Sequence, residues 1–167
     1  SRVFATYVLE GIALLAEGNN ARAIEMAGLK AGMPVGPLAL TDEVSLTLIA
    51  HIRKQTVADL QAEGKTPPSH GAYPVVDKMV GELKRPGKAA GAGFYEYPQG
   101  GKKHLWEGLK TNFPEGNHLP EADMIERLMF IQVIETVRCL QEGVLRSVAD
   151  ANIGAIFGWG FAPFKGG

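Results

Sequence analysis

Apolar residues recur at helical spacing through most of this chain. In the first segment they form one face, made of Val3, Phe4, Tyr7, Val8, Gly11, Leu14 and Leu15. This spacing predicts an amphipathic helix that ends at Gly18 and the asparagines that follow it. A second helix is expected over residues 21–31, closed by Gly32 and Pro34.

The next segment begins with Pro37, which fits the first turn of a third helix because its missing N–H costs nothing there. This third segment reaches Thr41 and Asp42, whose side chains suit the cap of a fourth helix over residues 43–62. The third and fourth helical segments are therefore expected to meet at this Thr-Asp pair.

The second half contains fewer and more widely spaced patterns. Residues 65–72 carry two prolines and one glycine, directly after Gly64, and predict a loop, and a short helix is expected over 74–83. Residues 94–97 alternate as a short strand does. Residues 121–142 predict a long helix, apolar nearly all round its middle, which favours a central and buried position. A last helix is expected over 148–157.

The chain also resembles itself when it is shifted by 125 residues. The shift places Arg2 on Arg127, Val8 on Val133, Glu10 on Glu135, Leu15 on Leu140, Glu17 on Glu142, Gly18 on Gly143 and Glu25 on Asp150, and after a one-residue insertion Gly32 on Gly158 and Pro37 on Pro163. Helical periodicity alone would align apolar positions by chance, but not Arg, two Glu, Gly and Pro in the same order. We therefore interpret the pattern as a duplication whose two copies pack on each other about a pseudo-twofold axis.

The duplication divides the chain into three parts. Residues 1–97 form a first helical repeat, residues 98–120 a weakly patterned connector, and residues 121–167 a second, truncated repeat. The fold class that follows is all-α, with a short β-strand near 94–97.

Composition excludes several classes of function. The 167 residues are 46% hydrophobic and 21% charged, with a net charge of −1, so nothing favours binding to nucleic acid or to an anionic membrane surface. No apolar run approaches the roughly 20 residues of a membrane-spanning helix. A single cysteine excludes an intrachain disulfide. Because the chain lacks an initiator methionine and stops in a glycine-rich loop, we expect it to be a piece of a longer protein.

Most catalytic patterns are absent. The four histidines, at positions 51, 70, 104 and 118, lack metal-ligand spacing, and no nucleophile elbow is present. Gly91-Ala92-Gly93 begins a dinucleotide-type glycine pattern, but Glu96 replaces the third glycine and the following residues predict a strand. A glycine loop needs a helix after it to hold a pyrophosphate, so no nucleotide site is expected there.

Glu10 and its repeat counterpart Glu135 each lie in an apolar helical stretch. As a pair they suggest an acid and a base. The favoured interpretation is structural, with each carboxylate binding the arginine of its own copy or capping a neighbouring helix.

Three stretches, residues 1–18, 24–27 and 32–44, closely resemble the C-terminal domain of 3-hydroxyacyl-CoA dehydrogenases. The most specific piece is the turn Gly-Met-Pro-Val-Gly-Pro at 32–37, followed by Leu38 and Asp42. Residues 87–97 look like the family's glycine-rich turn and Gly-Phe-Tyr strand, with Ala92 where the family usually has lysine. The fold implied is that of the 6-phosphogluconate dehydrogenase C-terminal domain.

The second copy is similar to the second helical repeat of multifunctional fatty-acid oxidation proteins. The likeness covers Glu135, Arg138-Cys139-Leu140, Glu142-Gly143, 149–151 and 158–167. Single-function dehydrogenases of the family lack this repeat, and two of their chains dimerise instead.

The resemblance implies a reaction and a separation of roles between two domains. Family members oxidise the 3-hydroxyl of an acyl-CoA to a ketone and pass the hydride to NAD. Their catalytic His–Glu pair and their NAD site lie in a preceding Rossmann domain, so no catalytic, cofactor-binding or metal residue is expected in this chain. The substrate-binding residues implied here are Ser1, Met33, Pro34 and Gly36, and Ser1 stands where relatives have asparagine.

The expected partners are therefore that Rossmann domain and the acyl-CoA, with self-association of the isolated chain through an apolar patch at the 33–37 turn. The expected location is the bacterial cytoplasm, with a eukaryotic organelle as the alternative. The alternative function is a helical assembly module that has kept the fold and lost the active site.

Overall fold

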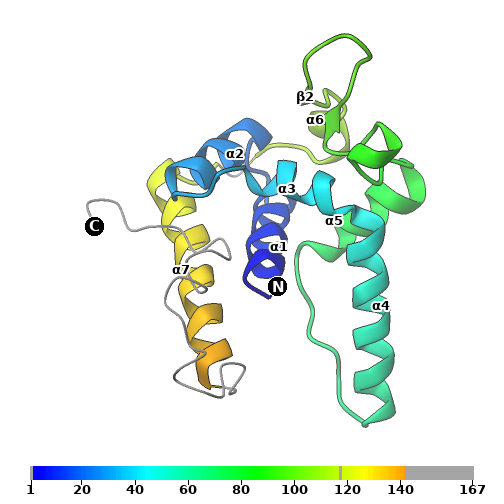
Figure 1. Ribbon diagram of the computed structural model, residues 1–167, viewed down its shortest axis with the longest axis vertical. Helices are drawn as coiled ribbons and strands as arrows, with labels where there is room; N and C mark the ends of the chain where they lie inside the picture. The colour runs from blue at the N-terminus through cyan, green and yellow to red at the C-terminus, as the bar shows by residue number, and fades with distance from the viewer. Residues whose placement is uncertain (1, 117, 142–167) are drawn as a thin grey trace.

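The computed structural model describes residues 2–116 and 118–141, which form a group of packed helices with a small β-hairpin at one end (Figure 1). The helices are α1 (Arg2–Ala16), α2 (Ala21–Lys30), α3 (Pro37–Val44), α4 (Leu46–Ala62), α5 (Tyr73–Asp77), the π-helical turn η1 (Lys78–Glu82), the 3₁₀ turn η2 (Lys88–Ala90), α6 (Leu109–Asn112) and α7 (Glu121–Gln141). The strands are β1 (Tyr95–Glu96) and β2 (His104–Leu105). The predicted all-α class with a short strand is confirmed.

The first two helices end where the sequence predicts. Gly18 has φ 101° and Gly32 has φ 100°, a backbone conformation that glycine adopts without the steric cost of a Cβ. Asn20 begins α2, where its side chain accepts a hydrogen bond from Ala23 N at 3.0 Å. Local residue chemistry therefore accounts for this part of the fold.

The junction of α3 and α4 differs from the prediction. Ser45, with φ 90°, breaks the helix, and its hydroxyl caps α4 by accepting from Thr47 N at 3.2 Å. The prediction that Thr41 and Asp42 form this cap is wrong. The Thr41 hydroxyl donates to Pro37 O at 2.7 Å within α3, and Asp42 is buried.

Helix α1 lies at the centre of the molecule, between α7 and α4, with α2, α3 and α5 also packed on it (Figure 1). Its side chains are buried over most of residues 7–15, which places this part of α1 in the core of the fold. The largest fully buried apolar side chains are Tyr7, Ile12, Leu14, Leu15, Ile24, Leu38, Leu46, Val76, Met79, Phe94 and Leu128. Four of these side chains, Tyr7, Ile12, Leu14 and Leu15, belong to α1, so α1 contributes a large part of the apolar surface that folding buries.

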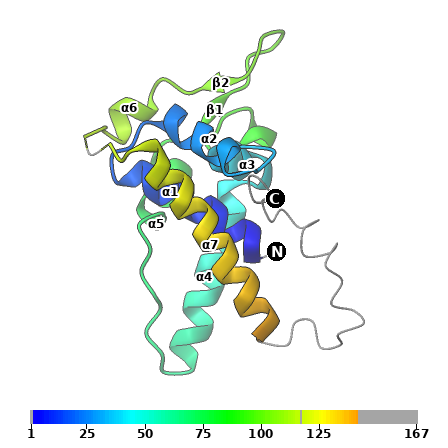
Figure 2. The same cartoon turned by 90° about the vertical axis from the view of Figure 1, so that its left-hand side faces the viewer.

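Helix α7 packs along α1, and the two run in opposite directions (Figure 2). The prediction that the helices over 2–17 and 127–142 pair is thus confirmed, whereas the pseudo-twofold relation stays a prediction. The last predicted helix, 148–157, lies outside the described residues. The expectation of a central, buried α7 is wrong. Its inner face is buried, but Phe130 is 63% exposed and Val137 46%.

The predicted strand at 94–97 is confirmed as β1, which pairs antiparallel with β2, with Tyr95 opposite Leu105. Residues 98–120, expected as a connector, thus contain β2 and α6. Each of these elements is too short to leave a periodic pattern in the sequence. The division of the chain into 1–97, 98–120 and 121–167 stays a prediction.

Candidate functional site

The turn between α2 and α3 is held by close packing of small residues. Pro37 fits into a space between α1 and α2 that Gly11 and Gly28 leave open, because a Cβ at either glycine would overlap the proline ring. Tyr7 of α1 donates its hydroxyl to Val35 O at 2.8 Å. The turn therefore has one fixed position against the first half of α1.

Glu25, on α2, caps the N-terminus of α3. Its carboxylate accepts from Leu38 N at 2.6 Å and Ala39 N at 3.2 Å, and from the Tyr95 hydroxyl at 2.7 Å. Gly36, at the cap position, has no side chain to do this, and a Cβ there would overlap the Glu25 carboxylate. Burial raises the pKa of Glu25, although the three hydrogen bonds oppose that shift.

Asp42 makes a similar connection between α3 and β1. Its carboxylate accepts from Phe94 N at 2.8 Å, Tyr95 N at 3.0 Å and the Tyr97 hydroxyl at 2.7 Å. Burial raises the pKa of Asp42, and the hydrogen bonds again act against the rise. Gly93 lies so close that a Cβ would overlap the carboxylate. These motif residues therefore have structural roles.

The predicted substrate-binding residues separate into two groups. Met33 is only 3% exposed and fills the core, and Gly36 is buried against Glu25. Pro34 is exposed and Val35 partly exposed. Of the residues expected to form the apolar wall in this turn, only Pro34 and Val35 are therefore accessible. Ser1 lies outside the described residues, and the hydrogen bond from Tyr7 to Val35 O ties the turn to the second turn of α1.

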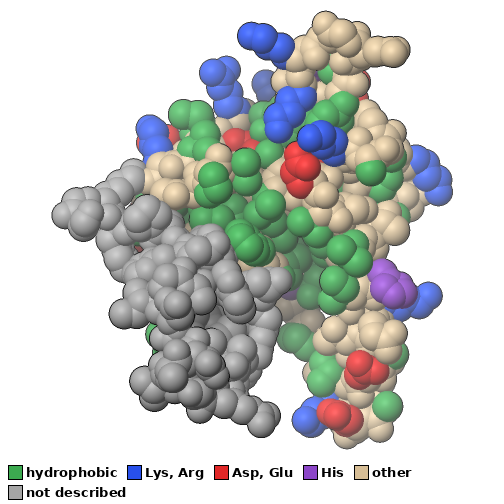
Figure 3. All heavy atoms as spheres, in the orientation of Figure 1, with side chains coloured by type: hydrophobic (Ala, Val, Ile, Leu, Met, Phe, Trp, Pro, Cys, Tyr) green, Lys and Arg blue, Asp and Glu red, His purple; other side chains and the backbone are tan. Residues whose placement is uncertain are grey.

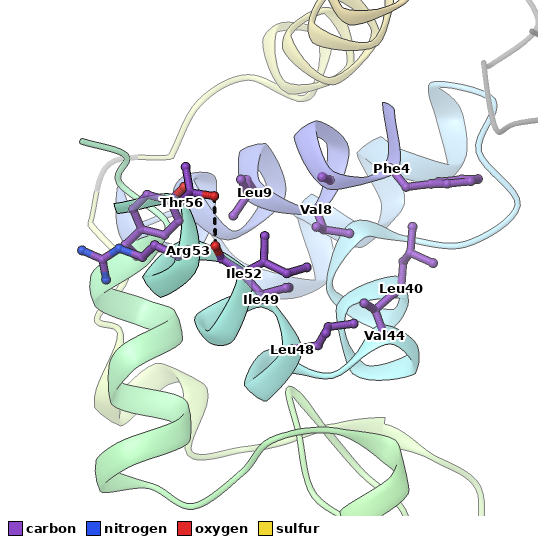
Figure 4. Close-up of a pocket in the computed structure, with 12 residues that line it drawn as sticks. Phe4, Val8, Leu9, Leu40, Val44, Leu48, Ile49, Ile52, Arg53 and Thr56 are labelled. Atoms are coloured by element: carbon purple, nitrogen blue, oxygen red, sulfur yellow. Dashed lines mark hydrogen bonds between the residues drawn. The ribbon is translucent and has the colours of Figure 1, made fainter. Parts of the chain in front are cut away.

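Helices α1, α3 and α4 line an open apolar hollow of about 360 Å³ (Figure 4). We call it the α1–α4 hollow. Its walls include Phe4 and Val8 from α1, Leu40 and Val44 from α3, and Leu48 and Ile52 from α4. Figure 3 shows hydrophobic side chains gathered on this face of the molecule. Sequence reasoning missed the hollow, although the i, i+4 pairs on α3 and α4 were a signal of two apolar faces meeting.

Two histidines have acidic neighbours, and neither forms a site for a base. His70 Nε2 is 3.8 Å from Glu10 Oε2, while its Nδ1 accepts from Ala72 N at 3.0 Å, so both ring nitrogens face protein groups. His118 Nε2 is 3.0 Å from Glu115 on an exposed turn. A general base needs a free nitrogen in reach of a bound substrate; the His70 ring offers none, and the His118 side chain is 57% exposed to solvent.

Glu10 binds Arg127, which lies on α7. Arg127 of α7 donates to Glu10 and, through Nη1, to Glu17 Oε1 at 2.7 Å. The expectation that Glu10 pairs with the arginine of its own copy, or caps a helix, is therefore wrong. The side chain of Glu135 lies outside the described residues. The hydrogen bond from Arg127 lowers the pKa of Glu17. The ion pairs of Arg127 with Glu10 and Glu17 join α1 to α7.

The glycine-rich segment does not fit a dinucleotide. Gly87 packs against the backbone of Asp42, where a Cβ would meet Asp42 O at 2.7 Å, and Gly93 packs against the carboxylate of the same residue. Between them lies η2, a 3₁₀ turn of three residues, too short to present a helix N-terminus to a pyrophosphate. Within residues 2–116 and 118–141, no cluster of His, Cys, Asp or Glu is placed to hold a metal ion. In the same part of the chain, every helix is too short or too polar to cross a bilayer.

Comparison with known proteins relates this architecture to one family. Residues 1–97 match the family described as 3-hydroxyacyl-CoA dehydrogenase, C-terminal domain. The whole chain is 37% identical to "Fatty acid oxidation complex subunit alpha" of Shewanella loihica over 171 residues, and 37% identical to the protein of the same name from Shewanella putrefaciens over 172 residues. It spans 23% of the length of each of these relatives. The chain therefore belongs to the family of 3-hydroxyacyl-CoA dehydrogenase C-terminal domains.

Proposed function

We propose that this chain is the helical C-terminal part of an NAD-dependent 3-hydroxyacyl-CoA dehydrogenase of fatty-acid β-oxidation, working in the bacterial cytoplasm. The observation that carries the proposal is the match of the entire chain to alpha subunits of fatty acid oxidation complexes. In this role the chain closes the substrate cleft, and its second repeat replaces a dimer partner.

The architecture supports a binding role and not a chemical one. Hydride transfer requires a dinucleotide site, and the described glycine-rich segment does not fit one. In our proposal NAD and the catalytic base belong to a separate Rossmann domain. This chain contributes Pro34, Val35 and the start of α1 as a wall for the acyl-CoA. We also propose that Ser1 binds the substrate, through one hydroxyl where the family resemblance implies an asparagine amide.

The test compares two proteins made from the same gene. The first is the 167-residue chain, and the second carries a nucleotide-binding domain ahead of it. With 3-hydroxybutyryl-CoA and NAD, NADH absorbance at 340 nm is expected to rise only with the second protein. NADH formation by the 167-residue chain alone would contradict the assignment of NAD binding and catalysis to a separate domain. A longer protein that folds and binds NAD yet turns over no 3-hydroxyacyl-CoA would contradict the proposed reaction.

The second candidate is a helical assembly module, and the outer face of α7 favours it. Phe130, Val137 and Leu140 lie on that face, each more than 40% exposed. Exposed apolar surface of this kind often marks an interface. The same experiment separates the two candidates, because an assembly module would give no NADH in either form.

A further inference from the structure

Strand β1 brings the tyrosine of the Gly-Phe-Tyr stretch onto the turn between α2 and α3. The strand lies beside both helices (Figure 2), and the Tyr95 hydroxyl donates to Glu25 Oε2 at 2.7 Å. Glu25 in turn caps α3, the helix that follows the turn. We propose that Tyr95 is a positioning residue, which acts through Glu25 to fix Pro34 and Val35 where the acyl-CoA lies against them, an inference that rests on the proposed function.

The Glu25 carboxylate is the link between the strand and the turn. Its Oε1 accepts from Leu38 N at 2.6 Å, and its Oε2 accepts from Ala39 N at 3.2 Å as well as from the Tyr95 hydroxyl. The last torsion of a glutamate side chain has no sharp preference, so the donors decide where the two oxygens lie. These oxygens fill the space beside Gly36 that a Cβ would occupy. Without the Tyr95 hydroxyl the carboxylate can rotate, and the turn loses part of its support.

Tyr95 is itself held at its backbone. Its N–H donates to Asp42 Oδ2 at 3.0 Å, and its carbonyl oxygen accepts from Arg85 Nη2 at 3.1 Å. Asp42 lies in the second half of α3, whereas Glu25 binds the first turn of that helix, so Tyr95 is tied to both parts of α3. Burial and the charge of Glu25 raise the pKa of Tyr95, and its hydroxyl therefore keeps its proton and remains a donor. These contacts fix the point from which Tyr95 reaches Glu25.

The turn is held on two sides and accessible on a third. Tyr7 donates to Val35 O at 2.8 Å from α1, and Tyr95 acts from β1 through Glu25. Pro34 is exposed and Val35 partly exposed, so these two side chains are free to contact a ligand. A wall that is already fixed binds more tightly than a loose one, because less conformational freedom is lost on binding. The hydroxyl of Tyr95 should therefore strengthen binding of the acyl-CoA without contact between the two.

The test uses the longer protein, which carries the nucleotide-binding domain, and the variant Tyr95→Phe, which removes only the hydroxyl. KM for 3-hydroxybutyryl-CoA is expected to rise about five- to ten-fold while kcat stays within about two-fold, because the turn contacts the substrate before and during the reaction alike. KM for NAD should stay unchanged. A purely structural role would instead lower the fraction of folded enzyme, which lowers kcat and leaves both KM values as they are.

Tyr97→Phe is the matched control, because it removes the same atom from a residue two positions further along the chain. The Tyr97 hydroxyl donates to Asp42 Oδ2 at 2.7 Å, away from the turn. This variant should keep the KM for 3-hydroxybutyryl-CoA of the unaltered protein. An equal rise of KM in Tyr95→Phe and Tyr97→Phe would overturn the inference, and so would a Tyr95→Phe enzyme with an unchanged KM, which would leave the reaction standing.

Amide hydrogen exchange in the same proteins separates this inference from the proposed function. The amides of Leu38 and Ala39, which donate to Glu25, are expected to exchange roughly five-fold faster in Tyr95→Phe and at an unchanged rate in Tyr97→Phe. A rise of KM without faster exchange at these amides would show that Tyr95 does not act through Glu25, and would overturn the inference. Faster exchange in a longer protein that turns over no 3-hydroxyacyl-CoA supports the hold of Tyr95 on the turn and contradicts the reaction.

Discussion

At the scale of the residue, the buried carboxylates of Glu25 and Asp42 determine which residue types fit beside them. Gly36 has φ −68°, so its backbone conformation does not require glycine. Glycine is required there because the Glu25 carboxylate occupies the space of a Cβ. The same argument holds for Gly93 beside Asp42. Each glycine thus allows an acidic side chain from another element to reach backbone N–H groups.

We predict that Gly36→Ala lowers the free energy of unfolding by about 2–3 kcal/mol, because the added methyl displaces Glu25 and weakens the cap of α3. Urea denaturation monitored by circular dichroism measures this. Gly81→Ala is the control, since a Cβ there meets nothing within 4 Å, and it should stay within about 0.5 kcal/mol of the unaltered chain. Equal stabilities for the two variants would show that Glu25 moves aside without cost.

At the scale of the element, ion pairs join helices that are far apart in the sequence but packed together in the fold. Arg127 of α7 reaches Glu10 and Glu17 of α1, and hydrogen bonding to Glu17 and Glu10 raises its own pKa, against the effect of burial. A second pair joins α7 to α2, where Lys30 donates to Glu121 at 2.7 Å with both side chains nearly half exposed. The first pair is less exposed and shares one cation between two carboxylates, so it should contribute more to stability.

We expect Arg127→Met to lower the free energy of unfolding by about 1–2 kcal/mol, since methionine keeps the apolar stem and removes the charge. Amide hydrogen exchange should quicken in α7 and stay unchanged in α4. Lys30→Met is the control and should cost less than about 0.5 kcal/mol. If the control costs as much as Arg127→Met, the cluster has no special role in docking α7.

At the scale of the whole molecule, the stability contributed by the ion-paired Glu17 and that contributed by the buried Glu25 and Asp42 change with pH in opposite directions. Glu17 has a pKa lowered from 4.5, so its contribution to stability is present above pH 4.5 and is lost as pH falls through the folded pKa. Glu25 and Asp42 have pKa values raised above 4.5 and 3.8. Their contributions are present below those values and are lost as pH rises through the folded pKa.

Stability measured from pH 3 to 8 should therefore rise toward about pH 4.5 through Glu17, and it should decline above about pH 3.8 through Asp42 and above about pH 4.5 through Glu25. Glu25→Gln is expected to flatten the decline, and Arg127→Met to flatten the acidic limb. The exposed Glu63→Gln should keep both limbs. A decline above pH 4.5 that is as steep in Glu25→Gln as in the unaltered chain would contradict the role given to Glu25.

Sequence by itself determined the longer helices α1, α2, α4 and α7, several of their ends, and the pairing of α1 with α7. The helices follow from apolar periodicity and from Gly18, Gly32 and Asn20 at their ends, and the pairing was predicted from the similarity of the chain to itself, which we interpret as a duplication. It also excluded a nucleotide loop at Gly91, since a strand follows the glycines where a helix is needed. Self-association through the turn at 33–37 stays a prediction.

Tertiary structure alone decided the partners of the charged residues and the shape of the surface. Tyr95 meets Glu25 from 70 positions away and Arg127 meets Glu10 from 117, and no local pattern encodes such pairings. Met33 is buried and Pro34 exposed although they are adjacent in one apolar turn, because the core lies on only one side of it. The α1–α4 hollow exists because three helices meet at angles that leave space between their apolar faces.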